Sequence, residues 1–211
     1  MRTQTKILRQ SKHPPILVLV HGLPFCLKST LARDLSSMLH FGLVGTGFFG
    51  KPNYDGAFQN FVSSRDKRYK ACVTITKNYL SKGHSVVVEG NFSLKRWRSD
   101  LMRYCRITGT PIVVVRCWCS RPEEIARRYQ RRKSFPFSLD KGAAFDAYVK
   151  EERVEIPLRA EELVGIQKVI QLQLDTGKWS VKTVAMRAAN SLLFISQAIA
   201  EWAKYEKANY D

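Results

Sequence analysis

The sequence predicts a single α/β domain in which parallel strands alternate with helices. Short runs of branched apolar residues recur along the chain, as in strands that are buried on both faces. Longer stretches between them carry apolar residues at helical spacing. The 211 residues also suffice for one domain with a continuous core. We therefore expect a basic tail over residues 1–15 and one domain over residues 16–211.

Five short segments are predicted to form the sheet. Three of them are rich in Val, Ile and Leu, one is a brief glycine-rich segment, and one alternates apolar and polar residues. In chain order they span residues 16–20, 43–46, 85–89, 111–117 and 168–174. The helices are predicted at residues 28–40, 57–82, 93–108, 122–133, 145–155 and 180–204.

The turn after the first predicted strand matches a phosphate-binding loop. Residues 22–29 agree with the pattern G-x-x-x-x-G-K-[ST] at every defining position except one. In such a loop, backbone N–H groups and the N-terminus of the following helix surround an anion. Lys28 would reach the outer phosphates, and the Ser29 hydroxyl would bind Mg²⁺. The predicted nucleotide-binding residues are Gly22, Leu23, Pro24, Phe25, Cys26, Leu27, Lys28, Ser29 and Thr30.

Leu27 stands where the pattern has its second glycine. That glycine usually adopts positive φ, which costs other residues on the order of 1–2 kcal/mol. Either the loop holds Leu27 in a strained conformation or its shape differs, and an ordinary turn followed by a chance Lys-Ser-Thr is the alternative. Positive φ at Leu27 would indicate an intact loop, whereas a side chain in the phosphate space would indicate an altered site.

Charged residues elsewhere are candidates for the same site. The third predicted strand ends in Glu89, and ligands bind at the carboxyl ends of parallel strands. Glu89 is expected to bind Mg²⁺ or to accept a proton from an attacking hydroxyl, with a structural ion pair as the alternative. Arg128 and Arg132 lie one turn apart on a predicted helix and share a face. Their crowding favours a lid that faces phosphates, although a solvated basic helix is the alternative.

No carboxylate follows the second predicted strand directly. The sequence there reads Gly45-Thr46-Gly47, and the first acidic residue beyond it is Asp55. Asp55 is a candidate for contact with an acceptor substrate, with a role in the local turn as the alternative.

Together these landmarks resemble the zeta-toxin-like and gluconate-kinase-like branch of phosphate-loop kinases, which includes polynucleotide kinase domains. The resemblance rests on residues 22–30, 86–98, 123–132 and 172–176. It implies a three-layer α/β/α fold with a parallel sheet of five strands in the order 2-3-1-4-5. It also implies ATP and Mg²⁺ as cofactors and transfer of the γ-phosphoryl group to a hydroxyl of a small molecule or a nucleic-acid end.

The resemblance also implies roles for individual residues. Lys28, Glu89, Arg128 and Arg132 match catalytic positions, Ser29 and Glu89 the metal site, and Arg98 an arginine that often contacts substrate. A protein that keeps the fold and a phosphate site, but binds nucleotide, another anion or nucleic acid without efficient transfer, is the alternative.

The composition is strongly basic, with 35 Lys and Arg against 18 Asp and Glu and a formal charge of +17. This excess indicates a polyanionic partner or substrate, and nucleic acid is a candidate. A diffuse basic surface without such a role is the alternative. The five cysteines form no C-x-x-C pair, so zinc is not expected. Their odd number, and an N-terminus that lacks the pattern of a signal peptide, predict a cytoplasmic protein.

Overall fold

The computed structural model describes residues 14–46, 65–92, 94–133, 158, 160–166 and 168–178, together with residues 180, 183, 186 and 190. In this part of the chain, five parallel strands form one sheet in the order β2-β3-β1-β4-β5. The strands are β1 Leu17–Gly22, β2 Gly42–Gly45, β3 Val86–Glu89, β4 Ile112–Trp118 and β5 Val169–Asp175. The predicted fold class and strand order are therefore confirmed.

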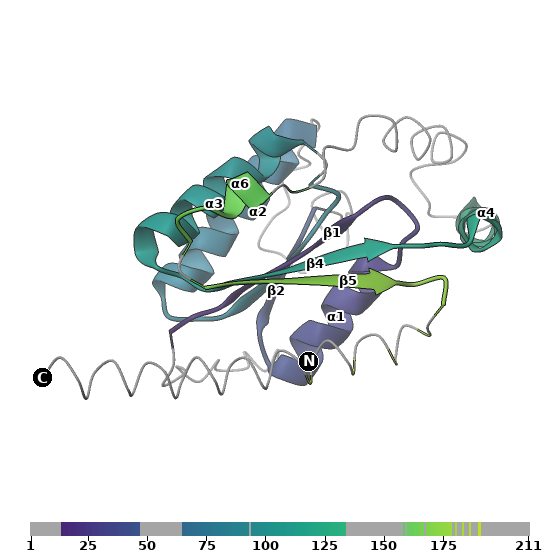
Figure 1. Cartoon of the computed structure of the whole chain (residues 1–211), viewed down its shortest axis with the longest axis horizontal. Helices are drawn as coiled ribbons and strands as arrows, with labels where there is room; N and C mark the ends of the chain where they lie inside the picture. Colours follow the sequence, from purple (N-terminus) through teal and green to yellow (C-terminus); the bar gives the residue numbers. More distant parts are fainter. Residues whose placement is uncertain are drawn as a thin grey trace, which may run out of the picture.

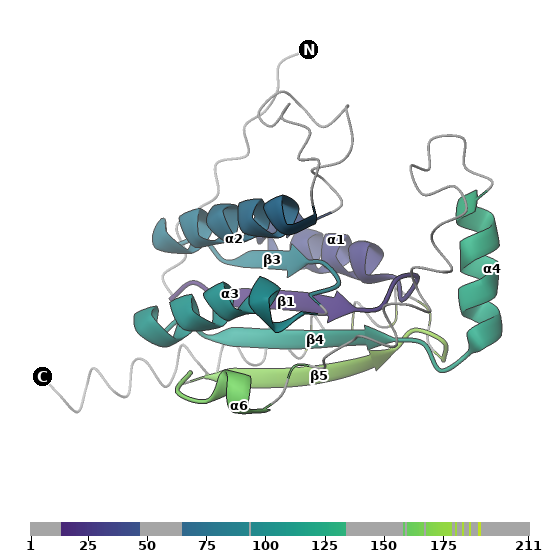
Figure 2. The same cartoon turned by 90° about the horizontal axis from the view of Figure 1, so that it is seen from above.

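Helices cover both faces of the sheet, as Figure 1 shows. The helices are α1 Lys28–Leu39, α2 Arg65–Ser81, α3 Lys95–Thr108, α4 Pro122–Lys133 and the short α6 Ala160–Leu163. Helix α1 lies on one face, and α2, α3 and α6 lie on the other (Figure 1). Helix α4 stands apart from both layers, beyond the carboxyl end of β4 (Figures 1 and 2).

Each face of the sheet has its own apolar core. Alternate residues of one strand point to opposite faces, so a strand covered on both sides must be apolar throughout. Leu17 and Leu19 of β1 pack under α2 and α3, whereas Val18 and Val20 pack against α1. All six residues of β1 are buried. The central strand is therefore fixed between two cores, which positions the loop that follows it.

The predicted element boundaries agree with the structure to within two residues where both are described. Helix α1 ends at Leu39, followed by His40 in the left-handed conformation. Of the helix predicted at residues 57–82, residues 57–64 lie outside the described residues, as do the helix predicted at 145–155, residues 1–13 of the tail and most of the segment 180–204. None of the helices in the described part of the chain has the length and apolar content needed to cross a membrane.

Candidate functional site

The candidate site lies at the carboxyl edge of the sheet, where β1 runs into residues 22–29, here called the phosphate loop. Gly22 begins the loop with a φ of +138°. A Cβ atom on Gly22 would come within 2.0 Å of the Cys117 carbonyl oxygen in β4. Only glycine fits there without a backbone shift, because β1 and the end of β4 approach so closely.

Two residues of the phosphate loop other than glycine adopt left-handed backbone conformations. Phe25 has a φ of 64°, and Leu27 has a φ of 57° and a ψ of 23°. Positive φ at Leu27 is the conformation expected of an intact loop, so the chain follows the glycine geometry without the glycine. Each such residue costs on the order of 1–2 kcal/mol, and the surrounding contacts must offset that strain.

Lys28 is the first residue of α1, and its side chain folds back over the loop. It is 8% exposed, and its Nζ donates a hydrogen bond of 2.6 Å to the Leu23 carbonyl oxygen. The positive charge is thus held across the loop rather than extended into solvent.

Ser29 and Glu89, the two predicted metal ligands, lie side by side. The Ser29 Oγ donates to Glu89 Oε2 at 3.2 Å, which joins the start of α1 to the end of β3. Glu89 is 4% exposed. The described residues contain no group of three or more His, Cys, Asp or Glu side chains that could hold a metal. One hydroxyl and one carboxylate nevertheless fit Mg²⁺, which keeps several water ligands and binds substrate phosphates.

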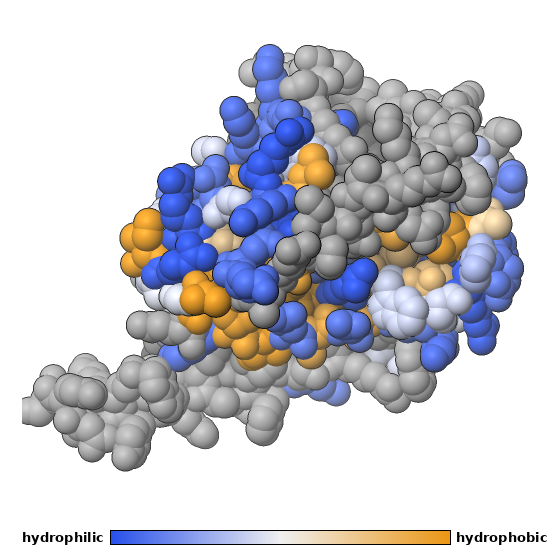
Figure 3. All heavy atoms as spheres, turned by 45° about the horizontal axis from the view of Figure 1, so that its top comes forward, coloured by the Kyte–Doolittle hydropathy of each residue, from blue (hydrophilic) through white to orange (hydrophobic). Residues whose placement is uncertain are grey.

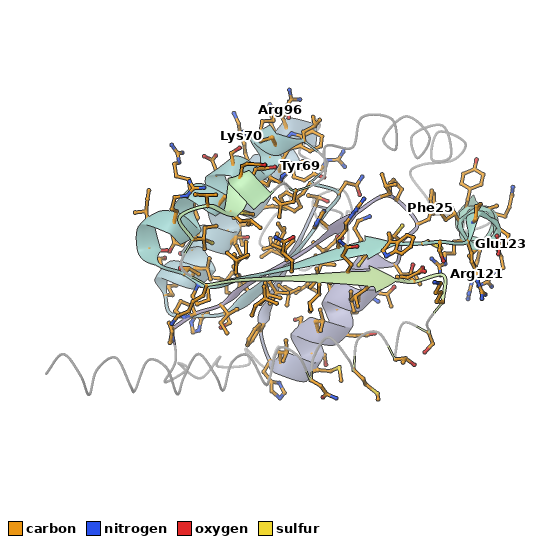
Figure 4. All side chains as sticks on the ribbon, in the orientation of Figure 1. Phe25, Tyr69, Lys70, Arg96, Arg121 and Glu123 are labelled. Carbon is orange, nitrogen blue, oxygen red and sulfur yellow. The ribbon has the colours of Figure 1, made fainter. Side chains whose placement is uncertain are left out.

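Arg128 of α4 reaches the backbone of the phosphate loop. Its Nη1 donates to the Phe25 carbonyl oxygen at 3.0 Å and to Thr176 Oγ1 at 3.1 Å, and its Nη2 donates to the Thr176 carbonyl oxygen at 2.6 Å. The ring of Phe25 also meets that of Tyr129 edge to face, with centroids 5.8 Å apart. Phe25 lies between the end of the sheet and α4 in Figure 4. The backbone of Arg132 lies on the same helix, whereas its side chain lies outside the described residues.

The end of β5 forms the third side of the site. Asp175 Oδ1 accepts hydrogen bonds from the backbone N–H groups of Ser120 and Gly177, at 3.0 and 2.9 Å. Burial alone would raise the pKa of Asp175, but these hydrogen bonds outweigh it and hold the pKa below its usual value. The Thr176 N–H and hydroxyl both donate to the Trp118 carbonyl oxygen. The Asp-Thr pair was visible in the sequence as part of the resemblance, but its link to Ser120 was not.

Arg98 lies away from solvent. It is 1% exposed, and its Nε and Nη2 donate to Glu162 at 2.8 and 2.6 Å. Its Nη1 donates to the Phe92 carbonyl oxygen at 2.7 Å. Direct contact with a substrate would require this ion pair to open. Asp55, the other predicted substrate-binding residue, lies outside the described residues.

His21, next to Gly22, is a buried titratable residue outside the sequence motifs of the site. It is 4% exposed and pairs in register with Arg116 of β4. Burial, followed by the charges of Arg98, Arg116 and Lys28, lowers the pKa of His21 to about 3. The imidazole is therefore neutral near pH 7. The sequence signal for it is a histidine at the end of an otherwise apolar strand.

Known structures share this fold. Kti12 from Chaetomium thermophilum, in complex with ADP-AlF3, is 19% identical with a TM-score of 0.56, over 82% of this chain and 97% of that one. The APS kinase CysC from Mycobacterium tuberculosis, in complex with AMPPNP and APS, is 16% identical with a TM-score of 0.54, over 85% and 98%. A gluconokinase from Sinorhizobium meliloti is 12% identical with a TM-score of 0.54, over 90% and 99%. At these identities the likeness shows a phosphate-loop kinase fold.

Comparison of the sequence with known proteins and protein families gives a more specific result than comparison of the folds. No curated protein matches the chain significantly. The model of one protein family, described as chromatin associated protein KTI12, matches residues 15–141. That range contains the phosphate loop, Glu89 and α4, and it covers more than half of the chain. The chain therefore belongs to the KTI12 family.

Proposed function

We propose that this protein binds ATP with Mg²⁺ at the phosphate loop and transfers the γ-phosphoryl group to a hydroxyl of a small molecule or a nucleic-acid end. One observation carries the proposal. A loop with glycine-like backbone geometry leads into Lys28 and Ser29, and Ser29 donates a hydrogen bond to Glu89 at the end of β3. The complexes of Chaetomium thermophilum Kti12 with ADP-AlF3 and of the APS kinase with AMPPNP support a nucleotide at this place.

The residues of the site have separate roles in phosphoryl transfer. Backbone N–H groups of the loop and the start of α1 hold phosphate oxygens, and Lys28 supplies positive charge beside them. Ser29 and Glu89 would hold Mg²⁺, which neutralises charge on the phosphates when bound. As the new bond from the acceptor oxygen to the γ-phosphorus forms, the bond to the bridging oxygen breaks and ADP leaves. The acceptor proton passes to a Glu89 carboxylate oxygen, and Arg132 on α4 adds charge from the lid.

A second function has specific observations in its favour: binding of nucleotide, another anion or nucleic acid without efficient transfer. β2 ends at Gly45 and is followed by Thr46, so the described residues offer no acid there to contact an acceptor. Helices α2 and α3 also carry exposed basic side chains, namely Lys67, Lys70, Lys95, Arg96, Arg103 and Arg106. Figure 3 shows a hydrophilic surface over these helices, and Lys70 and Arg96 point outward from the sheet in Figure 4.

A titration of ATP with and without Mg²⁺ tests the site itself. Lys28→Ala should weaken ATP binding by roughly a hundredfold, because it removes the positive charge inside the loop. Lys82→Ala, which removes an exposed lysine after α2, is the matched control and should bind like wild type. Ser29→Ala should abolish the gain in affinity that Mg²⁺ gives. Equal affinity of wild type and Lys28→Ala would show that the phosphate-loop assignment is wrong.

Turnover separates the two functions. Release of ADP in the presence of a panel of hydroxyl acceptors supports the kinase, whereas tight binding without turnover supports the second function. For nucleic acid, a steep loss of affinity with rising salt would reveal phosphate contacts. The cytoplasmic location stays a prediction, and the family's description as chromatin associated makes a nuclear location the alternative.

A further inference from the structure

We infer that α4 braces the phosphate loop, and that Arg128 is a positioning residue that acts on nucleotide binding through the backbone of Phe25. The brace consists of Arg128, Phe25 and Thr176. The inference rests on the proposed function, because it assigns to Arg128 a part in forming the same nucleotide site. It differs from the role implied by the resemblance, in which this arginine meets the transferred phosphoryl group.

The loop needs support from outside. Phe25 and Leu27 both hold positive φ, a conformation that side chains with a Cβ disfavour. The backbone of Leu27 is stabilised by the first turn of α1, since the Leu31 N–H donates to the Leu27 carbonyl oxygen at 3.0 Å. Phe25 precedes α1, and its carbonyl oxygen accepts a hydrogen bond from Arg128 of α4, which is 103 residues away in the sequence.

The contacts of Arg128 are suited to this task. The side chain is 13% exposed, so its hydrogen bonds to Phe25 and Thr176 are largely shielded from water. Its Nε lies 3.6 Å from Glu124 Oε2, one turn earlier on α4, which orients the guanidinium. Beside it, Tyr129 meets the ring of Phe25, and Phe25 is 9% exposed. Helix α4 therefore contacts both the backbone and the side chain of Phe25.

The other end of the brace is hydrogen-bonded to the end of β4. The Thr176 N–H and hydroxyl both donate hydrogen bonds to the Trp118 carbonyl oxygen, at 2.8 and 2.9 Å. The neighbouring Asp175 accepts a hydrogen bond from the N–H of Ser120, which lies two residues before α4 begins. The brace thus ties the loop to β4 and β5, the two strands on the far side of β1 from Glu89.

The two roles of Arg128 predict different measurements. An arginine that meets only the transferred group affects turnover and leaves ADP binding unchanged, because ADP lacks that group. A brace affects the binding of ADP as well, and it affects the loop even without nucleotide. Affinity for ADP and protection of the loop amides are therefore the decisive readouts.

The test compares Arg128→Gln with Arg127→Gln. Arg127 is the neighbouring, exposed arginine of α4 and pairs with Glu124. Arg128→Gln should weaken ADP binding roughly tenfold or more and speed hydrogen exchange of the amides of residues 23 and 25–28 in nucleotide-free protein. Arg127→Gln should change neither. Arg128→Lys keeps the charge but lacks the two guanidinium nitrogens that reach Phe25 and Thr176. Its ADP affinity and loop exchange should lie between those of wild type and Arg128→Gln.

A double-mutant cycle tests the link to loop strain. Leu27→Gly removes the penalty for positive φ, so Arg128→Gln should weaken ADP binding less in the Leu27→Gly background than in wild type. Unchanged ADP affinity and loop exchange in Arg128→Gln, with turnover reduced, would overturn the brace and leave the proposed function standing. Faster loop exchange in Arg128→Gln, in a protein that binds no nucleotide, would support the brace and refute the proposed function.

Discussion

Replacing Arg98 by Met should destabilise the fold by about 3–5 kcal/mol. The guanidinium donates hydrogen bonds of 2.6 and 2.8 Å to Glu162 of α6 and one of 2.7 Å to the Phe92 carbonyl oxygen. Arg98 and Glu162 have side chains 1% and 6% exposed. Without the arginine, the buried Glu162 carboxylate loses the cation that donates two hydrogen bonds to it, and this is the main source of the loss.

The magnitude can be separated into its parts with a second variant. Replacing both members of a buried ion pair by apolar residues is often close to neutral. Arg98→Met with Glu162→Leu should therefore recover most of the loss, although the Phe92 carbonyl oxygen still loses its donor at a cost of about 1–3 kcal/mol. Arg103→Met is the control on the same helix. Its exposed pair with Asp100, with side chains 66% and 49% exposed, should contribute under about 1 kcal/mol.

Urea denaturation measures these differences, because a loss of about 3–5 kcal/mol is a large part of the 5–15 kcal/mol typical of a domain. An Arg98→Met protein within about 1 kcal/mol of wild type would refute the structural role. If that same protein lost turnover with a hydroxyl acceptor, Arg98 would act on the substrate, as the resemblance implies. A stability loss that the double variant does not recover would show that Glu162 is not the partner that matters.

Two further predictions concern the same end of the sheet. Because the folded-state pKa of His21 is lowered from 6.5 to about 3, the unfolded chain takes up a proton in that window that the folded protein does not. Stability should fall by about 2 kcal/mol from pH 6.5 to 5 through this group, and His21→Gln should lose that part of the pH dependence in urea denaturation at pH 7 and 5. The Tyr69 hydroxyl accepts from the N–H groups of Asn91 and Phe92 at 3.1 and 3.2 Å, directly after β3, so Tyr69→Phe should cost about 1–3 kcal/mol. Tyr79→Phe on the same helix, whose hydroxyl makes no hydrogen bond within the described residues, should cost less than half as much, and equal losses would contradict the assignment.

The sheet could be predicted from the sequence because three of its five strands carry the same signal. A buried parallel strand must be apolar on both faces, so β1, β3 and β4 read as continuous apolar runs. The strand order, in contrast, came from the resemblance. Hydrophobic patterns alone do not specify which strands are neighbours, since any order of these strands buries similar side chains.

The phosphate loop could also be predicted, because its pattern describes a backbone shape formed by consecutive residues. Long-range partners could not. Arg98 and Glu162 are 64 residues apart, and Arg128 and Phe25 are 103 apart. Such pairs depend on how helices pack over the sheet, and Glu162 lies in a segment with no distinctive pattern. The sequence identified Arg98 and Arg128 as unusual, but it did not identify what they contact.

The strained backbone of the phosphate loop is therefore better understood together with α4 than from the missing glycine at position 27 alone. Positive φ at Phe25 and Leu27 costs on the order of 1–2 kcal/mol each, and a hydrogen bond from a charged donor contributes about 1.5–3 kcal/mol. The bond from Arg128 to the Phe25 carbonyl oxygen, with the ring contact to Tyr129, is thus of the size needed to offset this strain. A glycine at position 25 would remove both the strain and the ring that α4 packs against. The contacts of Arg128 and Tyr129 with Phe25 link the shape of the phosphate loop to the docking of α4, so a change that loosens α4 should also weaken the proposed nucleotide site.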